Sequence, residues 1–274
     1  MNYKLQAILP LFGLAFALIY LFYLVSTAGL NLGIDLKGGT QISFESKSAL
    51  DEKDIESILK SYEADIRIAR GVTGYVALIE IDSSINSTEI INILKGSGYS
   101  SSEFSVSSLT PSLGVSFFQQ AQLVLLFAFI FMAVTVFIIF RNPFPSFYVV
   151  LCGFADIVET LAISQLLGIK LTLATFAALL LLIGYSVDTD ILLTSRVLKT
   201  AEGELKTKIR GAMKTGLTMI GATAVALSAL FIISASSVIT QIASVLLIGI
   251  ILDIFNTWLT NAGLLRWYVE RRQK

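Results

Sequence analysis

The sequence has no histidine and a single cysteine, Cys152, among its 274 residues. Without histidine, the commonest metal ligand and the usual proton carrier near neutral pH are both missing. One cysteine can form neither an internal disulfide nor a thiolate metal cluster, and Cys152 stands in an apolar run, where we expect it to be a small packed residue. We therefore expect no metal and no cofactor, and any proton chemistry must use carboxyl groups.

Charge is also scarce, because only 15% of the residues are charged and 55% are hydrophobic. A soluble domain has about a quarter of its residues charged, and the mean hydropathy here is +0.78. The 20 basic and 20 acidic residues cancel, so no overall field favours binding to nucleic acid. This composition indicates an integral membrane protein.

Six apolar segments are long enough to cross a bilayer, which takes about 20 helical residues. The first could be a secretory signal peptide, since Lys4 precedes it, but its apolar run is longer than the roughly 7 to 15 residues of a signal core. We therefore expect it to be a retained anchor. The expected spans are Leu5–Val25, Ala121–Phe140, Phe147–Leu167, Leu171–Leu193, Leu217–Ile233 and Ile239–Leu264.

The basic residues of the short connections predict the orientation. If the N-terminus is cytoplasmic, that side holds 12 lysines and arginines, up to Lys274 at the C-terminal end. The other side holds Lys170 alone once the seven of the long insert 29–116, which such counts exclude, are left out. Cytoplasmic loops carry an excess of basic residues, so both termini should be cytoplasmic. The domains expected are residues 1–28 as the first transmembrane helix, 29–116 as an extracytoplasmic domain, and 117–274 as a five-helix bundle with a C-terminal tail.

The polar insert 29–116 predicts a small α+β domain. Alternating residues favour strands at Gln41–Ser46, Asp65–Ala69, Tyr75–Ile81 and Phe104–Leu109, with a turn at Gly71–Gly74. Helical spacing favours Leu50–Tyr62 and Thr88–Leu94, the second capped by Ser87. This βαββαβ order is that of a ferredoxin-like domain, and we find no catalytic constellation in it. The expected fold is thus a membrane all-α bundle of six helices with an inserted ferredoxin-like domain.

Five carboxyl groups fall inside the expected spans. A charged side chain at mid-membrane costs about 2.5 to 3.5 kcal/mol or more, so such residues are rare and generally functional. Because several carboxylates in one bundle cannot all stay ionised, we expect them to exchange protons or a small cation as the helices rearrange. The alternative is structural, with protonated acids joining helices. The candidates are Asp156 and Glu159 on the third span, Asp188 and Asp190 on the fourth, and Asp253 on the sixth.

Their helical positions add detail. Asp188 and Asp190 cannot share a face, because two residues turn a helix by about 200°. On the sixth span, Asp253 continues into a polar stripe that should face other helices. The fifth span offers small residues that permit close helix approach. The stripe is Asn256, Thr257, Thr260 and Asn261, and no lysine or arginine stands opposite these acids in the spans.

Two motifs resemble the SecD/SecF family of protein-export membrane proteins, within the resistance-nodulation-division superfamily. The segment from Asn31 to Thr40 resembles the signature that opens the outside domain of that family, and the segment from Gly184 to Leu193 resembles its fourth-span motif. The single large outside domain and the Gly-Tyr-Ser sequence resemble the SecF branch rather than the SecD branch. The sequence Val-Asp-Thr-Asp, with Asp253 and the run from Asn256 to Asn261, is similar to archaeal members of the SecF branch. The motif residues are Gly33, Asp35, Gly38, Gly39, Gly184, Tyr185 and Ser186, and Asp188 corresponds by its motif position.

The resemblance implies a role rather than a reaction. A member of this branch would pair with SecD, dock on the SecYEG channel of the plasma membrane and assist the export of polypeptides, driven by proton flow that moves the outside domain. This chain departs from the proton-driven bacterial members, because it lacks their embedded arginine on the sixth span. Two other functions remain open, a small-solute exporter of the same superfamily and a passive assembly subunit. We expect no enzyme.

Overall fold

The computed structural model describes residues 3–46, 48–62, 64–71, 74–99, 103–200, 203–234 and 236–272. Val72 and Thr73 of the expected turn, and Lys274 of the expected cytoplasmic charges, lie outside them. Within these ranges six helical spans are long and apolar enough to cross a membrane, which confirms the prediction of a multi-pass protein. They are α1 (Tyr3–Thr27), α5 (Pro111–Phe140), α6 (Pro143–Leu166), α7 (Leu173–Lys199), α8 (Leu205–Ile233), and a last span of α9 (Ser237–Phe255), the π-helix η2 (Asn256–Asn261) and α10 (Ala262–Arg272).

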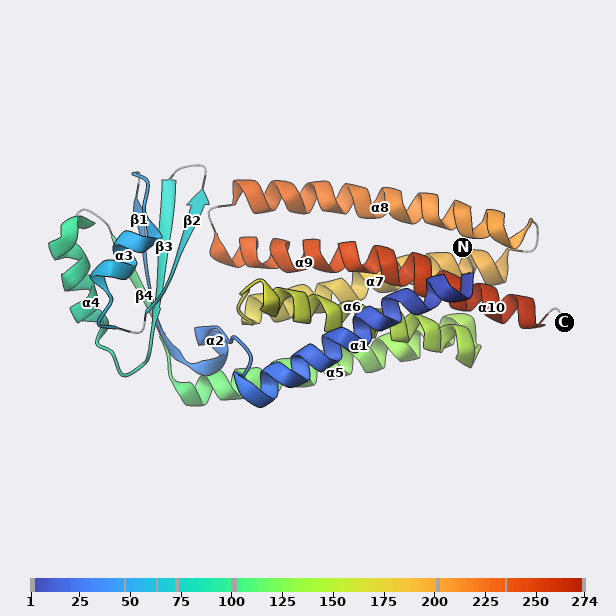
Figure 1. Cartoon of the computed structure of the whole chain (residues 1–274), viewed down its shortest axis with the longest axis horizontal. Helices are drawn as coiled ribbons and strands as arrows, with labels where there is room; N and C mark the ends of the chain where they lie inside the picture. Colours follow the sequence, from blue (N-terminus) through green and yellow to red (C-terminus); the bar gives the residue numbers. More distant parts are fainter. Residues whose placement is uncertain are drawn as a thin grey trace.

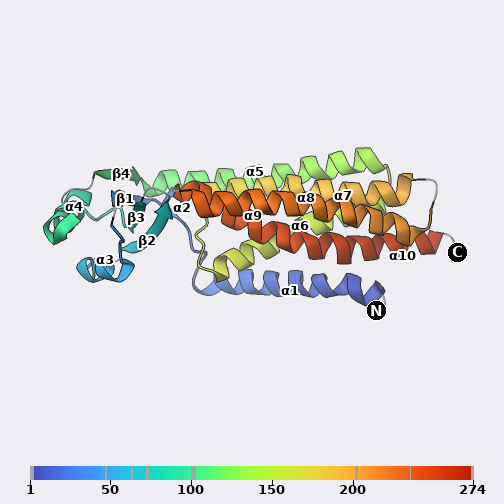
Figure 2. The same ribbon diagram turned by 90° about the horizontal axis from the view of Figure 1, so that it is seen from above.

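The helices form an elongated bundle with a sheet domain at one end (Figure 1). Seen from above, α1 runs along one side of the bundle and α5 along the other (Figure 2). The start of α1 and the end of α10 both lie at the end of the bundle that is farthest from the sheet. The domain therefore stands on one side of the predicted membrane, and the start of α1 and the end of α10 stand on the other.

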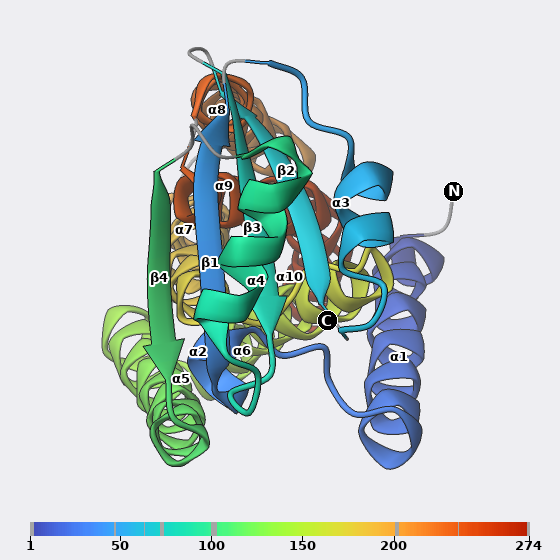
Figure 3. The ribbon, with the colours of Figure 1, turned by 90° about the vertical axis from the view of Figure 1, so that its left-hand side faces the viewer.

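The domain has the predicted ferredoxin-like topology. Its four strands pair antiparallel in the order β2-β3-β1-β4, and α3 and α4 cover one face of the sheet (Figure 3). Their contact forms a separate core in which Ile42, Ile55, Ile79 and Ile90 are fully buried. The bounds are β1 Gly39–Ser46, α3 Glu52–Ile58, β2 Asp65–Gly71, β3 Gly74–Ile81, α4 Ser87–Leu94 followed by the π-helix η1 Lys95–Tyr99, and β4 Phe104–Leu109.

The cap of α4 differs from the sequence prediction. Asn86, not Ser87, is the N-cap, and its side-chain oxygen accepts a hydrogen bond from the backbone N–H of Thr88 at 3.0 Å. Ser87 is the first helical residue. Asparagine and serine are about equally good caps. Because they are adjacent here, the sequence alone does not decide which of the two is the N-cap.

The junction between domain and bundle is compact because of paired glycines. The short helix α2 (Ile34–Lys37) ends at Gly38, whose φ of +83° favours glycine. A Cβ on Gly38 would lie 2.5 Å from the Cα of Pro111, the first residue of α5. This close approach places the start of the sheet directly against the helix that leaves it.

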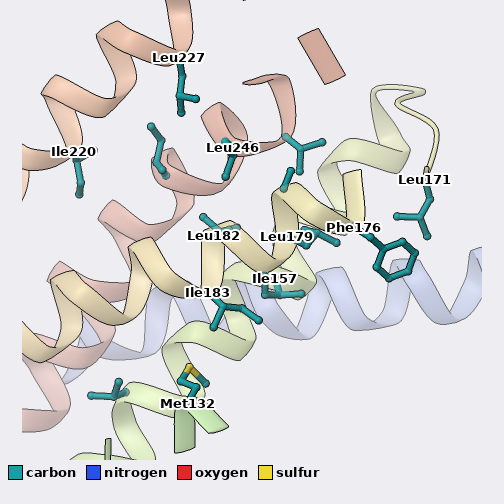
Figure 4. Packing of buried hydrophobic residues seen from close by; sticks show 14 of the residues in the cluster. Met132, Ile157, Leu171, Phe176, Leu179, Leu182, Ile183, Ile220, Leu227 and Leu246 are labelled. Atoms are coloured by element: carbon teal, nitrogen blue, oxygen red, sulfur yellow. The ribbon is translucent and has the colours of Figure 1, made fainter. Parts of the chain in front are cut away.

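The bundle core is built around α7. Leu179, Leu182 and Ile183 point into a cluster shared with α5, α6, α8 and α9 (Figure 4). Gly249 on α9 lets that helix approach closely, because a Cβ there would overlap the side chain of Leu182. Close contact among α6, α7 and α9 brings together the spans that carry the acidic residues.

Candidate functional site: a buried carboxyl network

Three aspartates from three different helices meet inside the bundle. Asp156 of α6 and Asp190 of α7 are 0% exposed, and Asp253 of α9 is 2% exposed. In the part of the chain that the structure describes, none of them forms an ion pair with lysine or arginine. Their negative charge must therefore be balanced by hydrogen-bond donors or by bound protons.

The donors come mainly from the π-helix η2 of the last span. The side-chain amide of Asn256 donates to Asp156 Oδ1 at 2.8 Å, and that of Asn261 donates to Asp190 Oδ1 at 2.6 Å. A π-helix has a wider turn than an α-helix and often marks a functional site. The predicted polar stripe of this span does face other helices, since all its members are buried.

Two threonine hydroxyls complete the network around Asp253. Thr189 Oγ1 lies 3.0 Å from Asp253 Oδ2, and Thr257 Oγ1 lies 2.9 Å from Asp253 Oδ1 and 3.0 Å from Asp190 Oδ1. A hydroxyl has one proton to donate, so Thr257 can serve only one of the two carboxylates. Both contacts are satisfied when a proton is on Asp190 or Asp253 and that carboxyl donates to the threonine oxygen. The geometry thus fits a proton shared by this pair.

Glu159 joins the network from the side of α1. Its Oε2 accepts a hydrogen bond from Asn256 at 2.9 Å, so one amide group serves both Glu159 and Asp156. Its Oε1 has no hydrogen-bond partner although the residue is only 6% exposed. Glu159 therefore extends the network toward α1, where a Cβ on Gly13 would lie 2.9 Å from Oε1.

The structure separates the fourth-span motif into two faces. Ser186 is buried and donates a hydrogen bond to Asp156 Oδ2. Asp188 is exposed and lies outside the buried network, as does Tyr185, which is 43% exposed. The expectation that Asp188 and Asp190 face different ways is confirmed, but Asp188 is not embedded in this bundle, because half a helical turn separates it from the packed face of α7.

The first motif positions the junction. A Cβ on Gly33 would lie 2.5 Å from Thr172 Cγ2, next to the start of α7. Asp35 accepts a hydrogen bond from the backbone N–H of Leu173, the first residue of α7, and its partial burial raises the pKa of its carboxyl group. The motif therefore fixes the domain linker onto α7, the helix that carries Asp190.

Lys170 adds a charged contact at this junction that the sequence reasoning used only to predict orientation. Its side chain is 2% exposed, and its Nζ lies 2.6 Å from Glu80 Oε2 on β3 and 2.9 Å from Asp65 Oδ2 on β2. The backbone bonds Gly33 N–H to Leu171 O and Leu171 N–H to Asn31 O, both 2.8 Å, lie beside it. We call the Lys170–Glu80–Asp65 group the junction clasp.

Some partners in the network could have been found from the sequence. Ser186, Thr189, Asp190 and Thr194 stand at i, i+3, i+4 and i+8 on α7, which marks one helical face, and all four are buried. No comparable signal exists for the junction clasp, because Glu80 and Asp65 lie 90 and 105 residues before Lys170 in the chain.

Comparison with known proteins gives a consistent family assignment. Residues 89–271 match the family described as Protein export membrane protein SecD/SecF, C-terminal, and residues 23–49 match the SecD/SecF GG Motif. The protein-export membrane protein SecF of Methanothermobacter thermautotrophicus is 39% identical over 91% of this chain and 88% of its own length. SecF of Methanocaldococcus jannaschii is 36% identical over 100% of this chain and 98% of its own length.

Solved structures share the fold. The crystal structure of SecDF, a translocon-associated membrane protein from Thermus thermophilus, matches with a TM-score of 0.76 at 18% identity, and SecDF in its super-membrane-facing form matches with a TM-score of 0.57. The first of these matches covers 98% of this chain but only 38% of the longer SecDF chain. On the matches to both families and to the archaeal relatives, the chain belongs to the SecD/SecF family of protein-export membrane proteins.

Proposed function

We propose that this chain is the SecF half of a SecD/SecF pair that assists polypeptide export at the SecYEG channel, and that it is not an enzyme. Its curated relatives are named as protein-export membrane proteins, which does not favour the alternative of a small-solute exporter. The solved SecDF chain is more than twice as long as the part this chain matches. A SecD partner would supply the remaining part.

An exposed face of α7 is suited to that partner. Leu181, Tyr185 and Asp188 are exposed there, and a Cβ on Gly184 would meet no atom within 4 Å. These residues belong to or flank the fourth-span motif. A charged residue on a span is expensive to leave facing lipid, so a protein partner explains Asp188 better than lipid does.

The orientation follows from the basic residues. We propose that both termini are cytoplasmic and that the sheet domain is extracytoplasmic. The start of α1 and the end of α10 lie together, away from the sheet (Figure 1), and the end of α7 and the start of α8, at the same end of the bundle, carry six of the 12 lysines and arginines counted for that side. The positive-inside rule supports this arrangement.

We further propose that Asp156, Asp190, Asp253 and Glu159 exchange protons as α6, α7 and α9 rearrange, and that this movement repositions the sheet domain. The observation that carries the proposal is the single Thr257 hydroxyl between Asp190 and Asp253, with no basic residue beside them among the described residues. Deprotonation of the pair would leave two ionised carboxylates competing for the one proton of the Thr257 hydroxyl. Their repulsion would favour a different packing of α7 against α9.

Proton uptake by vesicles that hold this chain together with its SecD partner tests the proposal. We expect Asp190→Asn and Asp253→Asn to abolish proton movement and the stimulation of export, whereas Asp54→Asn on the exposed surface of α3 should change neither. Unchanged proton movement and export in both network variants would refute coupling and favour a passive assembly subunit. If only Asp188→Asn abolishes proton movement, the coupling residue lies at the partner interface instead.

A further inference from the structure

A groove within the predicted membrane region is lined by α1, α6 and the middle of the last span. Its volume is about 560 Å³, within the range of roughly 300 to 1,000 Å³ found for small-molecule sites. Thirteen residues line it, and Glu159 and Tyr20 are the polar ones. Along α1 it extends from Leu9 to Tyr20, which is about 16 Å at 1.5 Å per residue. The groove is thus elongated along α1 and apolar, with a polar group inside it.

The floor and the mouth of the groove differ. Ala17 and Ala162 are each 5% exposed and form the floor with Glu159. Phe16, Leu166 and Phe255 are 70%, 67% and 51% exposed and stand at the mouth. Gly13 keeps the path to the carboxyl group open, because a Cβ there would lie 2.9 Å from Glu159 Oε1. A ligand can therefore enter from the lipid side and reach this oxygen.

Glu159 Oε1 is an acceptor without a partner. Leaving a buried polar atom unpaired costs about 1 to 3 kcal/mol, and more for a charged group, so the oxygen favours any ligand that brings it a hydrogen-bond donor. A pure hydrocarbon could fill the groove but would leave Oε1 unpaired. Glu159 stands seven residues before Leu166, about 10 Å from the domain end of α6, so the donor must be carried on an apolar chain.

We propose that this groove is a binding site for a long-chain amphiphile whose hydrogen-bond donor, an amine or a hydroxyl, pairs with Glu159 Oε1. The chain of the amphiphile lies along α1 between Leu9 and Tyr20. Because Asn256 also binds Glu159 Oε2 and Asp156, an occupied groove is in hydrogen-bond contact with the carboxyl network through one side chain. Binding itself does not depend on proton coupling.

Photocrosslinking tests the proposal on the full chain in phosphatidylcholine nanodiscs. The probe is hexadecylamine with a diazirine in its chain, and adducts are mapped by mass spectrometry. We expect saturable labelling of the groove segments of α1 and α6, competed by unlabelled hexadecylamine and hexadecanol. Glu159→Leu keeps the groove apolar and removes the acceptor, and it should weaken apparent affinity about tenfold, as expected for one lost hydrogen bond to a charged group.

Two controls keep the outcome decisive. Gly13→Leu should fill the path to Glu159 and abolish labelling, whereas Gly221→Leu, at a position where a Cβ meets nothing within 4 Å, should not. A diazirine-bearing hexadecane without the amine should label weakly and without saturation. Equal labelling by the amine and the alkane, or unchanged affinity in Glu159→Leu, would overturn the proposal, because the groove would then hold only bulk lipid chains.

Discussion

Replacing Lys170 with methionine should loosen the sheet domain from the bundle, because it removes the cation of the junction clasp. The cation is 2% exposed, but its partners differ, since the side chain of Glu80 is 12% exposed and that of Asp65 is 49% exposed. Removing one partner of a fully buried pair costs about 3 to 5 kcal/mol, whereas an exposed pair contributes about 0.2 to 1 kcal/mol. We expect about 2 to 3 kcal/mol here, mainly from Glu80 left without its cation.

Hydrogen exchange measures this opening directly. The N–H groups of Gly33 and Leu171 make the backbone bonds beside the clasp, and they exchange only when that contact opens. A loss of about 2 kcal/mol speeds their exchange roughly 30-fold, since 1.36 kcal/mol is tenfold. Amides in the core of the sheet, such as that of Ile79, should keep their rates.

Matched variants separate the clasp from a general effect of losing a lysine. Lys60→Met changes an exposed lysine of the same domain and should leave the Gly33 and Leu171 amides unchanged. Adding Glu80→Met to Lys170→Met should recover part of the loss, because no uncompensated carboxylate remains. Equal exchange in Lys170→Met and in the unmodified protein would show that the clasp does not hold the domain, and the reasoning would fail.

Three further outcomes are expected. Gly249→Ala should destabilise the bundle by about 1 to 3 kcal/mol because the new methyl overlaps Leu182, seen as a lower thermal unfolding midpoint, whereas Gly221→Ala should have little effect. Asn86→Ala should cost the sheet domain about 1 kcal/mol through the lost cap of α4, seen as faster amide exchange in α4, and Ser87→Ala should not. Burial raises the pKa of the Asp35 carboxyl group above its ordinary 3.8, so the folded state favours the protonated form. The stability that this proton provides is fully present below about pH 3.8 and is lost as the pH rises through the folded-state pKa. Asp35→Asn keeps an acceptor for Leu173 and should therefore gain stability over the unmodified protein as the pH rises from about 4 to 7, with the difference vanishing at lower pH; a pH-independent difference would contradict this.

The spans and the order of strands were predictable because their signals are local. Six apolar runs and the period-two alternation of residues such as Ile42 and Phe44 depend on near neighbours in the chain. Helix ends were less certain, since α5 begins at Pro111, ten residues before the predicted Ala121. Those ten residues pack partly against α2 at the junction, which hydropathy does not register.

The site was predicted in composition and only partly in arrangement. Burial of Asp253 with Asn256, Thr257 and Asn261 follows from their spacing. The motif pointed to Asp188, but the packing of α7 buries Asp190 instead. Which side of a helix is buried among its neighbours depends on tertiary packing and not on the local sequence alone. The clasp at Lys170 depends on strands that fold far from it in sequence, so local pattern could not reveal it.

The junction has a mechanical consequence. The chain enters the sheet domain through Gly39 and leaves it through Leu109, and these two residues pair across β1 and β4, while Gly38 rests on Pro111. The two connections between the domain and the bundle therefore meet at one point, beside β1 and β4. The junction clasp contacts β2 and β3, on the other side of the sheet from that point. Because Lys170 lies on the α6–α7 loop, a displacement of that loop would pull on β2 and β3 and would turn the domain about the Gly38–Pro111 contact.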